Sequence, residues 1–525
     1  MRFKTTTSRR PTMVAARAAL LGLGLIPLTA CTEAAPSPAS QSAATASTKA
    51  TTDEADNVRL VGYDNMQGRY ALQVTAKSDA ANGSWVYVAN VANPGLKEGL
   101  FNPITKKHEW NGTSIVDISD PAKPKYVWHI PNEVNASSRS VSVVYDFGPE
   151  KHDYLIRNVE ANDRLKFQIF DITTRDTDPS KISLVSEISG TPPNSCGPGC
   201  GGKFIDAPKP PENANYPEPR AHKGWWSQSS GLFYESANEP GFRSTLIQIW
   251  DLTDPKTPKF VGRAWLPGQK IGEPGFQDQY AHHPVVDEAN HRLYVGYREG
   301  SGHVAGFDIS NPAKPTLVWS FDTSPPGRGP HTVSPIVYNS VPGWEGDGLP
   351  RRYAFVTDEL GEECGKGEKS KSTMFDITHE DHPMPVSTFF LPVGDFCKSG
   401  GNFGPHQHAE TVNGELNRFE DKLAWVAYMN AGVRVVDLSD PYHLKDVGHY
   451  IPKTNVHTQG ARPIQLTDVD IDHRGFAYAT DRSAPVCLTP DGGNVTVDGG
   501  ASCVGTGLFV FEYTGKKPAA VKTSN

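Results

Sequence analysis

Outside its first 30 residues the chain has no apolar run that approaches the length of a membrane-spanning helix. It has no basic cluster beyond those residues either, and its formal net charge is −8, so nucleic acid is not an expected partner. The nucleophile-elbow serine motif, the phosphate-binding glycine loop and the EF-hand spacing are all missing. Helical periodicity is missing as well, which favours a chain made of strands.

The N-terminal segment has the features of an export signal. Basic residues precede a short apolar stretch, residues 18–28, and the sequence Leu-Thr-Ala-Cys follows directly and ends at Cys31. This pattern predicts a lipoprotein signal peptide over residues 1–30, with Cys31 acylated as the first residue of the mature chain. An ordinary signal peptide is the alternative. The sequence Ser-Arg-Arg at residues 8–10 also leaves a twin-arginine export route open.

The region after Cys31 separates the lipid from the folded part. Residues 31–56 are rich in Ala, Ser, Thr and Pro, which predicts a disordered tether. We therefore expect a monomer in the cell envelope, lipid-anchored on the periplasmic or extracellular face of a membrane. The remaining chain is longer than one ordinary core usually holds, which favours repeated units. Residues 516–525 are expected to form a polar tail.

Cysteine usage agrees with export. The chain has seven cysteines, and the six besides Cys31 make an even number that suits an oxidising compartment. Proximity in sequence predicts the disulfides Cys196–Cys200, Cys364–Cys397 and Cys487–Cys503. Metal ligation by Cys196 and Cys200 is the weaker alternative, because no histidine lies close to them in sequence.

One sequence motif recurs along the chain. Residues 112–124 read Gly-Thr-Ser-Ile-Val-Asp-Ile-Ser-Asp-Pro-Ala-Lys-Pro, and close copies occupy residues 246–258, 304–315 and 433–441. Three looser copies bring the total to seven, and they centre on Asp171, Asp376 and Glu512. Asp, Ser and Thr side chains bond nearby backbone amides and proline fixes φ, so each copy predicts a strand, a tight turn and a second strand.

Two further β-rich runs precede a typical copy, so each unit is expected to hold four strands. Seven such units predict an all-β, seven-bladed β-propeller over residues 57–515. The last copy is not followed by a fourth strand. Residues 58–63 resemble the fourth strands of other units, so we expect this N-terminal strand to close the last blade.

With these motifs the chain resembles the LVIVD-repeat proteins, bacterial exported proteins that are expected to be β-propellers. The resemblance covers roughly residues 58–514, and it implies the fold rather than the chemistry. The chain departs from the simple family pattern by long insertions, notably at residues 190–216 and 341–349.

The 17 histidines are distributed unevenly. Five sites lie where a unit's first strand begins, and they hold His222, His282 with His283, His331, His406 with His408, and His457. First strands line the channel of a propeller, so these histidines are expected to meet at one end of it. Imidazoles from several blades would suit a transition metal, with copper or iron favoured and zinc possible. His457 is the weakest candidate, and the sequence does not choose within either pair.

Two kinds of carboxylate could orient the ligating histidines. Glu410 is expected on the same strand as His408, and in three units the second strand is expected to be followed by a glutamate, namely Glu235, Glu299 and Glu359. A metal without thiolate ligands stays open to dioxygen or substrate, which favours an oxidase or oxygenase of a small molecule. Zinc-dependent hydrolysis with Glu410 as catalytic base is less favoured. A non-catalytic scaffold for a surface protein partner is the alternative from another class. Trp225 and Trp226 are expected either to wall a substrate pocket or to pack between blades.

Overall fold

The computed structural model describes residues 53–92, 98–161, 164–189, 221–239, 241–275, 280–298, 302–324, 329–344, 349–359, 370–394, 396–399, 401–452, 464–482, 486–488, 502–504 and 507–518. All of them belong to one compact unit, Lys49–Asn525. The predicted signal peptide, the lipidation residue Cys31, the glutamate Glu299, the weakest histidine candidate His457 and the predicted disulfide cysteines Cys196, Cys200 and Cys364 lie outside the described residues. Within them, no helix is long and apolar enough to cross a membrane.

The described chain is all-β, as predicted. Its helices are short 3-10 turns: η1 (Met66–Gly68), η2 (Pro179–Lys181), η3 (Glu288–Asn290) and η4 (Phe396–Ser399). Five sheets have four antiparallel strands each. They consist of β3 (Ala71–Asp79), β4 (Gly83–Asn90), β7 (Thr113–Asp117) and β8 (Lys125–Ile130); β9 (Val141–Phe147), β10 (His152–Ala161), β11 (Arg164–Asp171) and β12 (Ser183–Ser189); β13 (Ala221–Trp226), β14 (Leu232–Ala237), β15 (Leu246–Asp251) and β16 (Lys259–Ala264); β17 (Tyr280–Asp287), β18 (Arg292–Arg298), β19 (His303–Asp308) and β20 (Thr316–Asp322); and β21 (Pro330–Tyr338), β22 (Arg351–Asp358), β23 (Ser372–Asp376) and β24 (Met384–Phe389).

A larger, 11-stranded sheet holds the rest of the main strands. It contains one four-stranded path, β25 (Phe403–His408), β28 (Leu423–Met429), β29 (Val433–Asp437) and β30 (Lys445–Ile451), and a second, β31 (Leu466–Ile471), β32 (Phe476–Asp481), β35 (Gly507–Tyr513) and β2 (Val58–Asp64). The two paths are linked through the pair Met429↔Leu466. Short additional strands are β1 (Glu54–Asp56), β5 (Leu100–Asn102), β6 (Lys107–Glu109), β26 (Thr411–Val412), β27 (Glu415–Leu416), β33 (Val486–Leu488) and β34 (Ser502–Val504).

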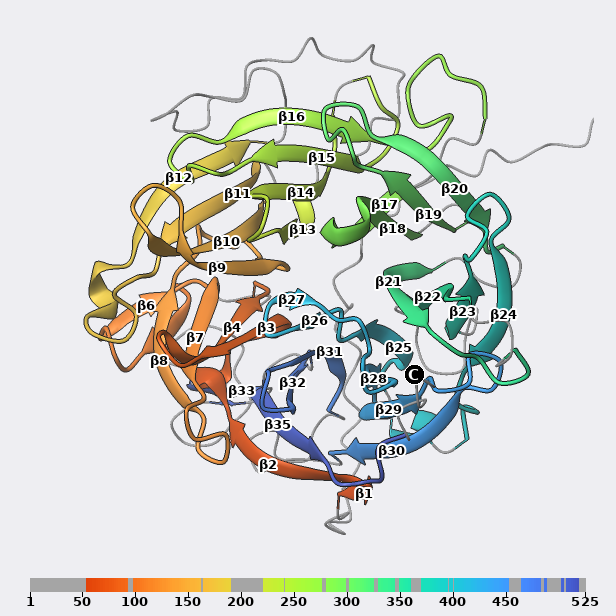
Figure 1. Ribbon diagram of the computed structural model, residues 1–525. Coiled ribbons are helices and arrows are strands. Elements are labelled where there is room, and N and C mark those ends of the chain that lie inside the picture. The colour runs from red at the N-terminus through yellow and green to blue at the C-terminus, as the bar shows by residue number, and fades with distance from the viewer. Residues whose placement is uncertain are drawn as a thin grey trace, which may run out of the picture. The chain divides into compact units, whose positions relative to one another are not determined.

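The sheets follow one another around a centre, in a propeller-like arrangement (Figure 1). The first strand of each four-stranded set contacts the first strand of the next, in the cyclic order β3, β9, β13, β17, β21, β25, β31 and back to β3. Apolar side chains from neighbouring sheets form the core between them; Tyr234, Val285 and Val333 of one buried cluster come from three successive sheets. The seven first strands therefore lie next to one another around the centre, and we call them the inner strands.

The recurring Asp turn has the same hydrogen bond in most copies. Asp117 Oδ1 accepts the Ser119 amide at 2.8 Å, and Asp308 Oδ1 accepts the Ser310 amide at 2.8 Å. The same bond forms at Asp171, Asp251, Asp376 and Asp437. The predicted turn chemistry is confirmed, because a carboxylate that bonds the amide two residues ahead specifies the reversal between the third and fourth strands.

The chain's two ends meet in one sheet. Strand β2 pairs antiparallel with β35, with Leu60 opposite Phe511, so the predicted pairing of residues 58–63 with the last repeat is confirmed. On the other side, Asp468 Oδ2 accepts the Val74 amide at 2.9 Å and Asp470 Oδ2 accepts the Ala76 amide at 2.7 Å. Carboxylates of β31 thus hold β3, the first inner strand.

The first strand begins earlier in the chain than the sequence predicts. Residues 31–56 were expected to be a tether, but Glu54–Asp56 form β1 and pair with β30. All three β1 residues are exposed, so the sequence carries no apolar signal for this strand. Backbone pairing to an open sheet edge requires no apolar side chain.

The cysteine predictions are described only in part. Cys397 is disulfide-bonded, and its predicted partner Cys364 is outside the described residues. Cys487 lies directly opposite Cys503 in the backbone register of β33 and β34. The three pairings stay predictions.

Candidate metal centre

Six of the seven inner strands share one irregularity, a β-bulge near the entry end. Register shifts lie between Ala221 and Gly224 in β13, between Ala281 and His283 in β17, and between Pro330 and Thr332 in β21. Strands β25, β31 and β3 have equivalent shifts. A bulge adds a residue that is not paired with the neighbouring strand and redirects its side chain. His222, His282, His331 and His406 all lie within these bulges.

The four bulge histidines form a row of neighbouring rings around the centre. The centroid distances are 4.5 Å for His222–His282, 4.2 Å for His282–His331 and 4.7 Å for His331–His406. His222 Nε2 lies 3.0 Å from His282 Nε2. The structure therefore brings together one histidine from each of four successive inner strands.

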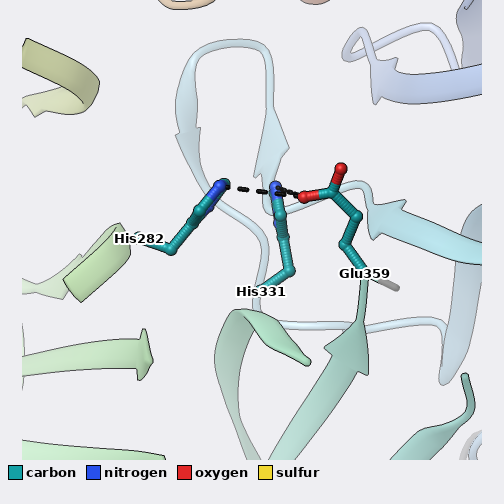
Figure 2. A group of neighbouring side chains, drawn as sticks. All are labelled: His282, His331 and Glu359. Carbon is teal, nitrogen blue, oxygen red and sulfur yellow. Dashed lines mark ion pairs between the residues drawn. The ribbon is translucent and has the colours of Figure 1, made fainter. Parts of the chain in front are cut away.

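Glu359, one residue past β22, lies at the middle of this row. Its carboxylate is 3.7 Å from His282 Nε2, 3.7 Å from His331 Nε2 and 3.1 Å from His406 Nε2. Figure 2 shows the ring nitrogens of His282 and His331 pointing toward this carboxylate. Ligand atoms of His282, His331 and Glu359 all lie within 4.8 Å of one another, so these three groups alone could hold a metal ion.

The outer nitrogens of three of these rings are held by the protein. His222 Nδ1 is 2.6 Å from Glu160 Oε1, and His331 Nδ1 is 2.6 Å from Thr332 Oγ1. His406 Nδ1 donates to the carbonyl oxygen of Thr467. Such outer partners orient an imidazole and leave its other nitrogen available as a metal ligand. The buried Nε2 of His331 has no hydrogen-bond partner among the described residues.

Burial keeps these histidines neutral. It lowers the pKa of His222 and His406, and it lowers the pKa of His282 and His331 well below the usual value, with neighbouring imidazoles adding to the effect. Burial alone would raise the pKa of Glu359, but neighbouring groups, Arg298 first among them, outweigh it and hold that pKa well below its usual range. The centre thus combines neutral imidazoles with one ionised carboxylate.

The structure distinguishes the two members of each histidine pair, His282 with His283 and His406 with His408. His283 Nε2 is 3.3 Å from Glu410 Oε1. His408 is bonded through Nε2 to Ser334 Oγ and through Nδ1 to Thr357 Oγ1, each at 2.8 Å. The His283 ring centroid lies 5.7 Å from that of His331, farther than the 4.2–4.7 Å between neighbours in the row, so His282 and His406 are the candidate ligands.

The candidate base Glu410 belongs to a neighbouring pocket. Gln407 Nε2 donates to both carboxylate oxygens at 2.7 Å. Burial opposes ionisation, but His283 and Gln407 lower the pKa of Glu410 to about 2. A carboxylate with so low a pKa is a weak base at neutral pH. The pocket is lined by Gln73, Thr75, Val141, Ser142, Val143, Gly224, Trp225, Trp226, His283, Glu410, Thr411 and Gly414.

Glu235, another predicted carboxylate partner, does not belong to the centre. It lies inside β14 and accepts the indole N–H of Trp250 at 2.8 Å. The prediction placed it after the second strand, but the strand continues to Ala237.

Sequence reasoning missed Lys223 and Arg298. Arg298 Nη1 is 3.2 Å from Glu359 Oε2, and Lys223 is buried beside His222. A lysine or arginine that follows a strand pattern is usually exposed, so the sequence carried no signal for either residue.

Comparison with known proteins identifies the repeat. The LVIVD repeat family matches residues 108–129, 305–323 and 420–451, which are parts of three of the predicted units. No curated protein matches the chain.

Solved structures resemble the chain only distantly. A periplasmic gluconolactonase from Pseudomonas aeruginosa is 11% identical over 84% of this chain and 98% of its own, with a TM-score of 0.39. A chain of the mitotic checkpoint complex is 10% identical over 90% of this chain and 98% of its own, with a TM-score of 0.41. Neither likeness carries an argument about function.

Proposed function

We propose that this LVIVD-repeat protein is a lipid-anchored, seven-bladed β-propeller that holds a transition metal at one end of its channel. The ligands would be His222, His282, His331 and His406, with Glu359 beside them. The protein would act as a metal-dependent oxidase or oxygenase on a small molecule. The observation that carries the proposal is the row of four imidazoles, one from the bulge of each of four successive inner strands.

Three features of the row support metal binding over ordinary packing. Its rings are neutral because they are buried. Outward contacts at Nδ1 of His222, His331 and His406 leave the Nε2 atoms of these rings to face the centre. Buried polar atoms normally have partners, so an unpartnered Nε2 such as that of His331 suggests a missing ligand.

The donor set favours copper or iron, and zinc is possible. Imidazole suits all three metals, and the described centre offers no thiolate. A bound redox metal would supply the site for dioxygen or substrate, which the protein residues alone lack.

The seven-bladed architecture and the anchor are part of the same proposal. Seven repeats, seven inner strands in cyclic contact and the pairing of β2 with β35 support seven four-stranded blades. The sequence Leu-Thr-Ala-Cys that ends at Cys31, a lipoprotein signal motif, supports attachment to the cell envelope by lipid.

Elemental analysis of the purified full-length protein tests the metal site. We expect near-stoichiometric copper, iron or zinc in the wild-type protein and its loss in the double variant His331→Ala/His406→Ala. The matched control is His408→Ala, which removes a buried imidazole of the same inner strand that bonds Ser334 and Thr357. Wild-type protein that takes up no metal, even after incubation with each ion, would favour the non-catalytic scaffold instead.

A further inference from the structure

The two carboxylate oxygens of Glu359 face different groups of the centre. Oε2 lies 3.7 Å from the Nε2 atoms of both His282 and His331. Oε1 lies 3.1 Å from His406 Nε2. Glu359 is only 4% exposed, so its surroundings rather than solvent determine how the carboxylate is turned. The orientation of this one side chain decides which oxygen each imidazole faces.

Arg298 contacts Glu359 at two points. Its Nε donates to the Glu359 carbonyl oxygen at 3.2 Å, and its Nη1 lies 3.2 Å from Oε2. Both nitrogens belong to one planar guanidinium, whose donors have a fixed fork geometry. One side chain thus ties the carboxylate of Glu359 to the main chain of the same residue. This restricts the rotation of the carboxylate and keeps Oε2 on the side of His282 and His331.

Arg482 approaches the other oxygen in a different way. Its Nη1 lies 3.8 Å from Oε1, beyond hydrogen-bond distance. The side chains of Arg482 and Arg298 are exposed to almost the same extent, 24% and 23%. Both arginines offset the charge of a buried carboxylate, which requires a nearby cation. Arg298 adds directed contacts to that charge, so the two arginines separate the effect of charge from the effect of position.

Strand β18 supports this part of the centre from the neighbouring sheet. Gly296 and Arg298 are two residues apart in β18 and share one face of it. At Gly296 the strand is so close to β21 that a Cβ would lie 2.6 Å from the His331 carbonyl oxygen. The same face of β18 therefore contacts the main chain at His331 and, through Arg298, the side chain of Glu359.

We propose that Arg298 is a positioning residue of the metal centre, and that its two contacts fix the Glu359 carboxylate as a metal ligand beside the imidazoles. The inference rests on the proposed metal site, because it assigns the group that orients Glu359 within that site. A residue that orients a ligand changes metal affinity without touching the metal. Lysine at this position would keep the positive charge but would not reproduce the planar fork.

Titration of the metal-free, full-length protein with Co(II) tests this role, because the visible spectrum of bound Co(II) depends on the type and geometry of its ligands. We expect Arg298→Lys to bind Co(II) about 10- to 100-fold more weakly than the wild-type protein and to change the spectrum of the bound ion. Arg482→Lys is the matched control. It keeps the charge near Oε1, where the wild-type contact is already beyond hydrogen-bond distance, so affinity and spectrum should stay those of the wild type.

A second variant keeps the test decisive if urea denaturation shows that Arg298→Lys is poorly folded. Arg298→Ala leaves a space in which free guanidinium ion, at concentrations far below those that denature proteins, can replace the missing fork. We expect added guanidinium to restore the Co(II) spectrum of this variant toward that of the wild type. A spectrum that does not respond to guanidinium would count against the role of Arg298.

The two proposals fail in different ways. Arg298→Lys protein with the affinity and spectrum of the wild type would overturn the role of Arg298 and leave the metal centre standing. Equal losses in Arg298→Lys and Arg482→Lys would overturn it too, because charge alone would then explain them. Wild-type protein that binds neither Co(II) nor copper, iron or zinc would overturn the metal centre, and the role of Arg298 with it.

Discussion

His222 Nε2 lies 3.0 Å from His282 Nε2, although 60 residues separate the two in the chain. Two neutral imidazoles at that distance either share one proton or face one cation, since two lone pairs repel each other. Glu160 holds the other nitrogen of His222 at 2.6 Å. If His222 Nδ1 carries the proton that Glu160 accepts, its Nε2 lone pair points at His282, which is the arrangement that a metal ligand needs.

Replacing His282 by Ala is expected to abolish or strongly weaken metal binding, by at least about tenfold, whereas His283→Ala is expected to retain the metal. The two residues are adjacent and both are buried, so the pair is its own control for burial. His282 faces His222 and Glu359, while His283 faces Glu410. Chelator competition on the purified variants measures the affinity. Equal losses in both variants would contradict the assignment of His282.

Gly296→Ala should disturb the centre from the neighbouring strand β18. A Cβ at this position would lie 2.6 Å from the carbonyl oxygen of His331 and 2.7 Å from that of Pro330. The bulge that carries His331 would have to move, so we expect about 1–3 kcal/mol lower free energy of unfolding and weaker metal binding. Urea denaturation and metal titration measure the two effects.

Gly262→Ala is the control for this steric change. Its Cβ would collide with the carbonyl oxygen of Pro312 on the outer side of the sheet. It should cost comparable stability and leave metal affinity unchanged. A Gly296→Ala protein with wild-type metal affinity would show that the bulge does not position His331.

Glu235 predicts a dependence of stability on pH. Burial raises the pKa of this carboxyl to about 8 in the folded protein, whereas the unfolded value is about 4.5. The folded state therefore binds more protons than the unfolded state between these values, and the stability from the protonated carboxyl is lost as pH rises through about 8.

Glu235→Gln keeps an acceptor for Trp250 and cannot ionise. The difference in unfolding free energy between variant and wild type should rise from pH 5 to 9 by up to a few kcal/mol, on the order of the linkage per pKa unit. Denaturant titrations across this range that give a constant difference would reject the raised pKa.

Cys31→Ser is expected to block lipid attachment and to release the protein from the membrane fraction or leave its leader uncleaved. The expectation depends on the sequence Leu-Thr-Ala-Cys at the end of the apolar stretch. Cell fractionation with an antibody against the folded part measures the distribution. Wild-type protein that is found free in the periplasm or medium would contradict the predicted acylation of Cys31. A Cys397→Ser variant is a useful control, since this cysteine is disulfide-bonded in the folded part.

The Asp turns could be predicted from sequence because their chemistry is local. The carboxylate of Asp117 bonds an amide two residues away, and the following prolines restrict the backbone wherever the motif occurs. The strand order within each sheet could be predicted from the same motif, because consecutive strands that are joined by short turns pair as neighbours. The pairing of residues 58–63 with β35 was predictable because the last repeat lacks a fourth strand and these residues resemble the fourth strands of other units.

The carboxylates show where that reasoning reached its limit. The sequence named Glu359 among possible partners of the histidines, and Glu359 is the one at their centre. It also named Glu235, which is buried against Trp250 instead. Position after a strand is a one-dimensional property, whereas the distance to a histidine on another sheet depends on how the sheets pack.

The sequence by itself determined the repeat, the turns, the strands and the clustering of histidines at strand entries, since each of these depends on residues close together in the chain. Only the tertiary structure decided that His282 and His406, not His283 and His408, belong to the central row. The physical reason is the bulge, because one extra residue in a strand reverses which side chains face the centre. Lys223 lies in the same bulge as His222 and is buried, whereas its sequence neighbours alone predict an exposed side chain.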